Sequence, residues 1–300
     1  MEALEIACDE SGYEGEKLVD TTTDVFAHAG VRLGAAAARD ALAEVRRRVR
    51  SPATQYKATH LLREKHRPVL VWFLGPAGPL TGRAHVYVID KVYYLLGKLA
   101  DLLLADPDGA GLSADGPARA LSEELFAGHP GHDYLVAANE LLRGKERRDV
   151  HGPVEAFFRL AADLPGRARA EAFRARLRDD PALSVIDPLI PAVVRAVLRW
   201  GADGTPVSIL HDRQTMLPRE RISRIGQLLP APLRLDGLRL GAAEDEPRIQ
   251  LADMLAGTVR KIVQDELRGN GDPELTALVR PYLDPGSVWG DQRSWALLTA

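Results

Sequence analysis

The order of strand-like and helix-like segments restricts the fold of this chain more than any other feature of its 300 residues. Short runs rich in apolar and β-branched residues predict five strands, at residues 4–8, 24–33, 83–90, 205–212 and 233–240. A short polar connection joins the first two, which favours antiparallel pairing, whereas a helical segment separates the last two, which favours a parallel crossover. The sequence therefore predicts an α/β fold with a mixed β-sheet flanked by helices.

Helical segments account for most of the remaining sequence. They are predicted at residues 34–50, at about 58–74 with a break at Pro68, at 91–104, at 218–229 and at 248–267. Between residue 91 and about residue 200, helix follows helix, with Gly- and Pro-containing linkers between them. This order is the one expected of a ribonuclease-H-like core at residues 1–90 and 201–270, with a large all-helical insertion at 91–200 and an irregular C-terminal tail at 271–300.

Composition excludes several classes of protein. The hydrophobic fraction of 46% and the charged fraction of 27% are typical of a soluble globular protein. The net charge of -3 excludes a generally basic nucleic-acid coat, although 39 basic residues leave room for a local basic groove. A single cysteine, Cys8, excludes an intramolecular disulfide and a Cys-rich zinc site. No apolar run is long enough to span a membrane, so we expect no membrane partner and a cytoplasmic protein.

Acidic residues stand where a mixed sheet would bring them together. Asp9 and Glu10 end the first predicted strand, Asp212 ends the fourth, and Asp253 lies inside the last helix. Carboxylates at the ends of buried strands are costly unless a positive group meets them. Carboxylate oxygens are the ligands that Mg²⁺ or Mn²⁺ prefers, and two such ions can activate water and stabilise the leaving oxygen in phosphodiester hydrolysis.

The last helix carries a polar stripe of its own. Gln250, Asp253 and Gly257 lie three and then four residues apart and so share one helix face. An amide, a carboxylate and a small residue along the edge of a core helix are typical of a face that borders a site.

Each acid also has an ordinary structural interpretation. Asp9 would accept turn N–H groups before Gly12, Asp212 would cap the helix that follows it, and Asp253 would pair with Arg260. These alternatives remain open for each residue taken alone, and the matching positions of the three in the element order favour a common site.

Several short motifs resemble those of the domain of unknown function 3800 family. The motifs are "DESG" near the N-terminus, "YKATHLL", "IDK" after a strand, "HD" at a strand end and "IQLADMLAG", and they extend from Ile6 to about Arg260. Members of that family look like ribonuclease-H-like proteins, and their acids are suspected metal ligands. The resemblance implies an acidic centre supported by basic and amide side chains: Asp9, Glu10, Asp212 and Asp253, with Lys57, Lys91 and Gln250.

One position departs from the family pattern. The family often has an acid two residues before the lysine of its second motif, and here that residue is Gln55. Because a neutral amide does not replace an anionic ligand, either this position is peripheral or the metal site is weakened.

The two lysines have competing interpretations. Lys91 would contact a scissile phosphate or steady the attacking water, or else form an ion pair with Asp90 or Asp9. Lys57 would contact substrate, or else be a solvated lysine at a helix start.

The function that the sequence favours is a Mg²⁺- or Mn²⁺-dependent phosphodiesterase, a nuclease acting on DNA or RNA. Asp9, Asp212 and Asp253 would be the metal ligands, Glu10 a further ligand or a group that orients water, and Gln250 and Lys57 substrate contacts. The alternatives are a non-catalytic nucleic-acid- or protein-binding module with the same fold, and a metal-dependent hydrolase of small phosphorylated molecules.

Overall fold

The computed structural model describes residues 3–50, 56–104, 131–214 and 216–300. Gln55, the departure from the family pattern, lies outside these residues. The chain divides into two compact units, the first formed by residues 1–13, 25–88 and 189–300 and the second by residues 14–24 and 89–188. Each unit is described by itself.

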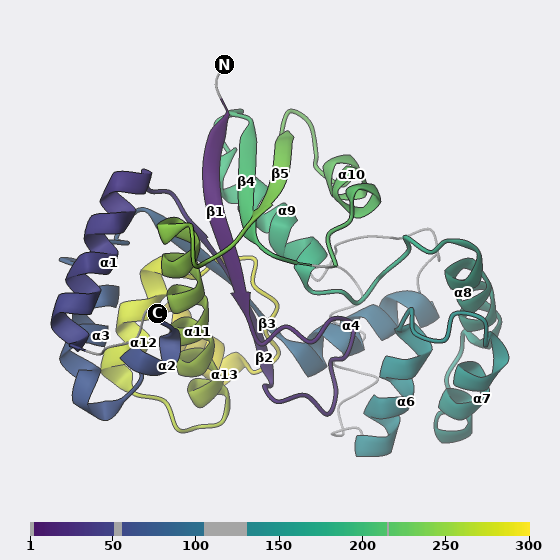
Figure 1. Cartoon of the computed structure of the whole chain (residues 1–300). Helices are drawn as coiled ribbons and strands as arrows, with labels where there is room; N and C mark the ends of the chain where they lie inside the picture. Colours follow the sequence, from purple (N-terminus) through teal and green to yellow (C-terminus); the bar gives the residue numbers. More distant parts are fainter. Residues whose placement is uncertain (1–2, 51–55, 105–130, 215) are drawn as a thin grey trace. The chain divides into compact units, whose positions relative to one another are not determined.

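A five-stranded mixed sheet forms the centre of the first unit, which confirms the predicted α/β class (Figure 1). Its strands in chain order are β1 (Leu4–Ser11), β2 (Val25–Val31), β3 (Ala84–Asp90), β4 (Val207–Asp212) and β5 (Leu235–Gly241). Their order across the sheet is β3-β2-β1-β4-β5. Strand β1 pairs antiparallel with β2 and parallel with β4, and β4 pairs parallel with β5.

Both faces of the sheet are buried at strand β2. All seven of its residues are buried, although consecutive side chains point to opposite faces. On one face, a Cβ atom added at Gly30 would lie 3.2 Å from Ile6 Cγ2 and 3.4 Å from Trp200 Nε1 of helix α9 (Leu189–Trp200). On the other face, Ala7 and Leu210 pack with Ile249 of helix α11 (Pro247–Leu267).

Helix α11 is the central helix of the face that it covers. The helices that share its hydrophobic core are α1 (Ala35–Val49), α2 (Ala58–Leu61), α3 (Arg67–Leu74), α12 (Pro273–Val279) and α13 (Gln292–Thr299). Figure 1 shows most of them grouped around α11. Helix α10 (Arg219–Gln227) lies in the connection between β4 and β5. The break predicted at Pro68 is present, since a 3₁₀ turn (Glu64–His66) separates α2 from α3 and Pro68 stands in the first turn of α3.

The prediction of an irregular C-terminal tail is wrong. Residues 273–299 contain α12, a 3₁₀ turn (Arg280–Tyr282) and α13, and the segment between the last two lies along β3. Leu283 forms a parallel bridge with Val86, and Val288 N donates to Val88 O at 3.0 Å. This segment hydrogen-bonds to an edge strand that would otherwise expose unpaired backbone groups. Its apolar residues, among them Trp289, complete the core, which is why it orders.

The second unit is helical and includes the connection between β1 and β2. Its helices are α4 (Lys91–Leu104), α6 (His132–Leu142), α7 (His151–Leu160) and α8 (Arg167–Asp179). Asn139 of α6 fixes residues 14–24 to these helices, because its side chain accepts from Leu18 N at 3.0 Å and donates to Glu16 O at 2.9 Å. Residues 14–24, which the sequence assigns to the core, thus belong to the helical unit. Helix α9, which the sequence assigns to the insertion, belongs instead to the first unit and packs on the sheet.

A buried arginine links α8 to the end of α6 and to the loop that follows it. Arg174 of α8 is fully buried, and its guanidinium donates to Arg143 O, Glu146 O and Asp149 O at 2.8, 3.1 and 2.7 Å. Arg143 ends α6, whose last carbonyls have no partner within the helix. The carbonyl oxygens compensate the buried charge, so this arginine serves the fold.

Candidate functional site

The carboxyl ends of β1 and β4 bring two of the predicted acids to one edge of the sheet. The parallel register pairs Cys8 with His211, and Asp9 and Asp212 are the next residues of the two strands. Asp9 is 7% exposed, and its Oδ1 accepts from the amide of Glu10 at 2.7 Å. Asp212 Oδ1 accepts from Ala243 N at 3.1 Å, in the turn that leads into α11. Asp212 does not cap the following helix, because α10 begins only at Arg219.

Asp253 of α11 lies within electrostatic range of this edge. Burial raises the pKa of Asp9 to about 9, and the negative charges of Glu10, Asp253 and Asp212 add to the effect. Burial also raises the pKa of Asp253 to about 6, with contributions from Asp212 and Glu10, while Lys57 acts in the opposite direction. The Asp253 carboxylate thus interacts electrostatically with Asp212, whose strand pairs with that of Asp9.

Buried oxygens without a hydrogen-bond donor mark the same region. Asp253 Oδ2 and Gln250 Oε1 are both inaccessible to solvent and have no partner. Gln250 is 4% exposed and lies one helical turn from Asp253. The carboxylate of Asp253 is therefore not an ordinary ion pair. Unsatisfied buried acceptors are costly, and a bound cation would compensate them.

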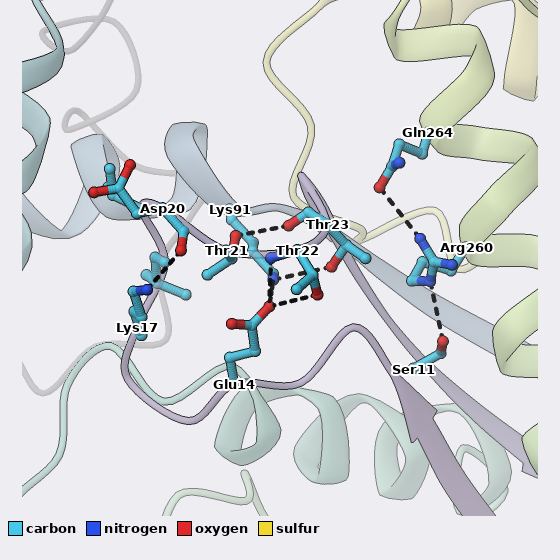
Figure 2. Close-up of polar contacts among 12 residues, drawn as sticks. Ser11, Glu14, Lys17, Asp20, Thr21, Thr22, Thr23, Lys91, Arg260 and Gln264 are labelled. Carbon is cyan, nitrogen blue, oxygen red and sulfur yellow. Dashed lines mark hydrogen bonds and ion pairs between the residues drawn. The ribbon is translucent and has the colours of Figure 1, made fainter.

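Arg260 continues the polar stripe of α11 beyond Gly257. Its Nε donates to Ser11 Oγ at 3.0 Å and its Nη1 donates to Gln264 Oε1 at 3.2 Å, as Figure 2 shows. The guanidinium thus joins the end of β1 to α11. The sequence interpretation that paired Arg260 with Asp253 did not anticipate Ser11 as its partner.

Glu10 points to the opposite face of the sheet from Asp9, because adjacent residues of a strand alternate between faces. The antiparallel register places Glu10 directly opposite His28 of β2. Its Oε1 accepts from Gln214 Nε2 at 2.7 Å, and its Oε2 lies 3.6 Å from His211 Nε2. Two acids that are adjacent in the sequence are therefore divided between two environments.

Gly257 allows α2 to approach α11 and so positions Lys57. A Cβ atom added at Gly257 would lie only 2.4 Å from Ala58 Cβ, the residue after Lys57. Lys57 is exposed and stands directly before α2, close enough to lower the pKa of Asp253. The small residue of the predicted stripe is thus needed for packing.

We expect Gly257→Val to lower the free energy of unfolding by about 2 kcal/mol, because the new side chain overlaps Ala58 and forces α2 away. Urea unfolding followed by tryptophan fluorescence measures this, since Trp72, Trp200, Trp289 and Trp295 all belong to the first unit. A double-mutant cycle with Ala58→Gly supplies the control. If the two substitutions are additive, the contact with Ala58 is not the cause.

Lys91 belongs to the second unit. It is buried at the start of α4, where its Nζ donates to Thr23 Oγ1 at 3.1 Å and lies 3.8 Å from Glu14 Oε1 (Figure 2). Thr22 also donates to Glu14 Oε1, through its backbone N–H at 2.8 Å. These contacts within the second unit give Lys91 structural partners, Thr23 and Glu14, that the sequence did not predict. Its contact with a substrate phosphate stays a prediction.

The oxygen donors near this sheet edge are of the type that a hard divalent cation prefers, but they do not form a complete set of metal ligands. Asp9, Asp212, Asp253 and Gln250 supply oxygen donors, and two of these side chains have oxygens that lack a partner. Within residues 3–50, 56–104, 131–214 and 216–300, no group of three His, Cys, Asp or Glu side chains stands at metal-binding spacing. Mg²⁺ commonly takes one or two carboxylates, keeps several waters and uses substrate phosphates, so a closed protein set is not required.

Sequence reasoning missed the two histidines beside Glu10. His28 and His211 are fully buried in β2 and β4, and their Nε2 atoms are 3.2 Å apart. The available signal was a histidine in the middle of the apolar segment "VFAHAGV" and another directly after the apolar residues of "VSILHD". Cys8, on the same face, is a buried thiol whose pKa is raised by burial and by Asp9 and Glu10, which disfavours a nucleophilic role.

Comparison with known proteins found no matching family model, curated protein or solved structure. No helix in the described parts of the chain has both the length and the apolar character needed to cross a membrane.

Proposed function

We propose that this chain is a Mg²⁺- or Mn²⁺-dependent phosphodiesterase with a ribonuclease-H-like core, acting on DNA or RNA. The observation that carries the proposal is that Asp9 and Asp212 stand on paired strands at one sheet edge and interact electrostatically with Asp253, with a raised pKa at Asp9 and Asp253 and an unpartnered buried oxygen on Asp253. Such perturbed carboxylates are typical of functional sites. The strand order β3-β2-β1-β4-β5 and the family resemblance of the motifs support the same proposal.

Each side chain at the proposed metal centre would have a distinct role. Asp9, Asp212 and Asp253 would hold the cation, which when bound would lower the pKa of a water and offset negative charge on the phosphate. Gln250 would accept a hydrogen bond from a donor at the centre, such as a water, through its unpartnered Oε1. Lys57, exposed beside Asp253, would attract the polymer backbone. Glu10 faces away from these three side chains, so we assign it no direct role at this centre.

The test is cleavage of end-labelled single- and double-stranded DNA and RNA with Mn²⁺ or Mg²⁺. We expect Asp253→Asn to reduce the rate about 100-fold or more, because the amide withdraws an anionic donor. Asp245→Asn is the matched control, since it makes the same change at an exposed residue just before α11. Unchanged cleavage by Asp253→Asn and by Asp9→Asn would overturn the proposal.

A non-catalytic binding module is the second candidate, and Gln55 in place of a family acid favours it. Metal-independent binding of nucleic acid or protein that survives replacement of all three aspartates would support the module. Hydrolysis of mononucleotides without cleavage of polymers would indicate the third alternative, a hydrolase of small phosphorylated molecules.

A further inference from the structure

Three adjacent strands bring polar side chains to one point on the sheet face opposite Asp9. Strand β1 lies between β2 and β4, and it contributes Glu10, while β2 contributes His28 and β4 contributes His211. The register places Glu10 opposite His28 and Cys8 beside His211, so these side chains share a face. Both imidazoles are fully buried, and the Glu10 side chain is 13% exposed.

The distances among the three side chains match the spacing of metal ligands. His28 Nε2 and His211 Nε2 are 3.2 Å apart, and Glu10 Oε2 is 3.6 Å from His211 Nε2. Two ligands at zinc-to-nitrogen distances around a tetrahedral ion are about 3.3 Å apart. The imidazole pair already has this spacing, and the carboxylate oxygen exceeds it by a few tenths of an ångström.

The hydrogen bonds around His211 and Glu10 leave one lone pair of each side chain facing the other. His211 Nδ1 lies 3.0 Å from the backbone carbonyl oxygen of Asp212, which only accepts, so Nδ1 carries the proton and Nε2 of the neutral ring is a lone pair. Glu10 Oε1 accepts from Gln214, and Oε2 is buried without a partner. A ring N–H donated to a carbonyl is the usual support of a metal-binding histidine.

We propose that His28, His211 and Glu10 bind a zinc-type transition-metal ion at a site separate from the aspartates. Two imidazoles and a carboxylate suit Zn²⁺ or Co²⁺ better than Mg²⁺, and they would leave a position for water. The ligand set is incomplete as it stands, in keeping with the lack of any finished three-residue group in the described residues, and the partly exposed Glu10 is the side chain that must move. The competing occupant is a proton shared in a hydrogen bond from His28 Nε2 to His211 Nε2, which leaves His28 Nδ1 buried without a partner. The proposal does not depend on the phosphodiesterase assignment.

Titration of the full chain with Co²⁺ tests this site, because cobalt bound by nitrogen and oxygen in a tetrahedral site absorbs visible light strongly. We expect visible bands that Zn²⁺ abolishes and that persist in Asp9→Asn/Asp253→Asn. Glu10→Gln and His28→Gln are expected to raise the dissociation constant at least about 10-fold. Tryptophan fluorescence verifies that the variants fold, and Glu10→Gln keeps the test valid if His28→Gln does not.

Two results would overturn the proposal. The first is wild-type protein that shows no cobalt bands at millimolar metal, which would leave the proton as the occupant. The second is binding that Glu10→Gln leaves intact and Asp9→Asn/Asp253→Asn removes, which would place the metal at the aspartates.

Discussion

Replacing Asp284 by alanine is expected to lower the free energy of unfolding of the first unit by about 3 kcal/mol, because it leaves buried charged and polar partners uncompensated. Asp284 is 1% exposed and lies between β3 and α9. His85 Nε2 of β3 lies 2.5 Å from its Oδ2, Arg195 of α9 donates to its Oδ1, and Gly286 N donates to Oδ1 at 2.6 Å. The substitution would therefore separate the C-terminal segment from both elements.

The pH dependence of this cluster separates the charge of Asp284 from its packing. Burial raises the pKa of Asp284, but the hydrogen bonds from His85 and Arg195 outweigh it and bring the pKa to about 2, below the ordinary value of 3.8. The contribution is thus fully present above pH 3.8 and is lost as the pH falls through about 2.

Asp284→Asn is the matched variant, since it keeps an acceptor oxygen and removes the charge. We expect a cost of about 1–2 kcal/mol for it at neutral pH, with the difference from wild type narrowing toward about pH 2. Urea unfolding followed by tryptophan fluorescence gives both values for the first unit. An alanine variant as stable as wild type, or an asparagine difference independent of pH, would contradict this account.

Replacing Asp9 by asparagine is expected to stabilise the metal-free protein, by roughly 2 kcal/mol at about pH 8. Asp9 is buried among carboxylates, and burial and the charges of Glu10, Asp253 and Asp212 raise its pKa to about 9. Because the folded chain holds this proton more tightly than the unfolded chain, wild-type stability falls as pH rises from the ordinary value of 3.8 to about 9. Asparagine removes this dependence, so the gain should shrink toward acidic pH.

Thermal unfolding with and without Mn²⁺ measures how Asp9→Asn changes the stability of the metal-free protein and its stabilisation by bound metal. We expect Asp9→Asn to raise Tm by about 4–8 °C without metal at about pH 8, and to abolish the increase in Tm that Mn²⁺ produces in wild type. Asp40→Asn, at an exposed position on α1, is the control and should change Tm by less than about 2 °C. A lower Tm in metal-free Asp9→Asn would show that the carboxylate is stabilised by its surroundings and would argue against a cation-binding role.

Local patterns were sufficient for the elements of secondary structure in the core. The helix expected at 248–267 occupies Pro247–Leu267, and the strand expected at 205–212 occupies Val207–Asp212. These elements combine clear periodicity with apolar burial, so their boundaries lie close to the expected ones. The C-terminal helices were missed because short segments such as Pro273–Val279 are stabilised by contacts with distant residues rather than by their own periodicity.

The amino-acid sequence alone determined the α/β class, the division into strands and helices, and the placement of Asp212 at the end of its strand, because side-chain periodicity and chain breaks are local properties. The first strand extends beyond the predicted end to Ser11, so Asp9 lies inside it and pairs with Ala29. Tertiary structure decided which side chains meet. The register of β1 between β2 and β4 separates Glu10 from Asp9 and joins it to His28 and His211, which are 183 residues apart. A shift of one residue in that register would exchange the two faces, and only the packing of α11 on one face and α9 on the other selects between them.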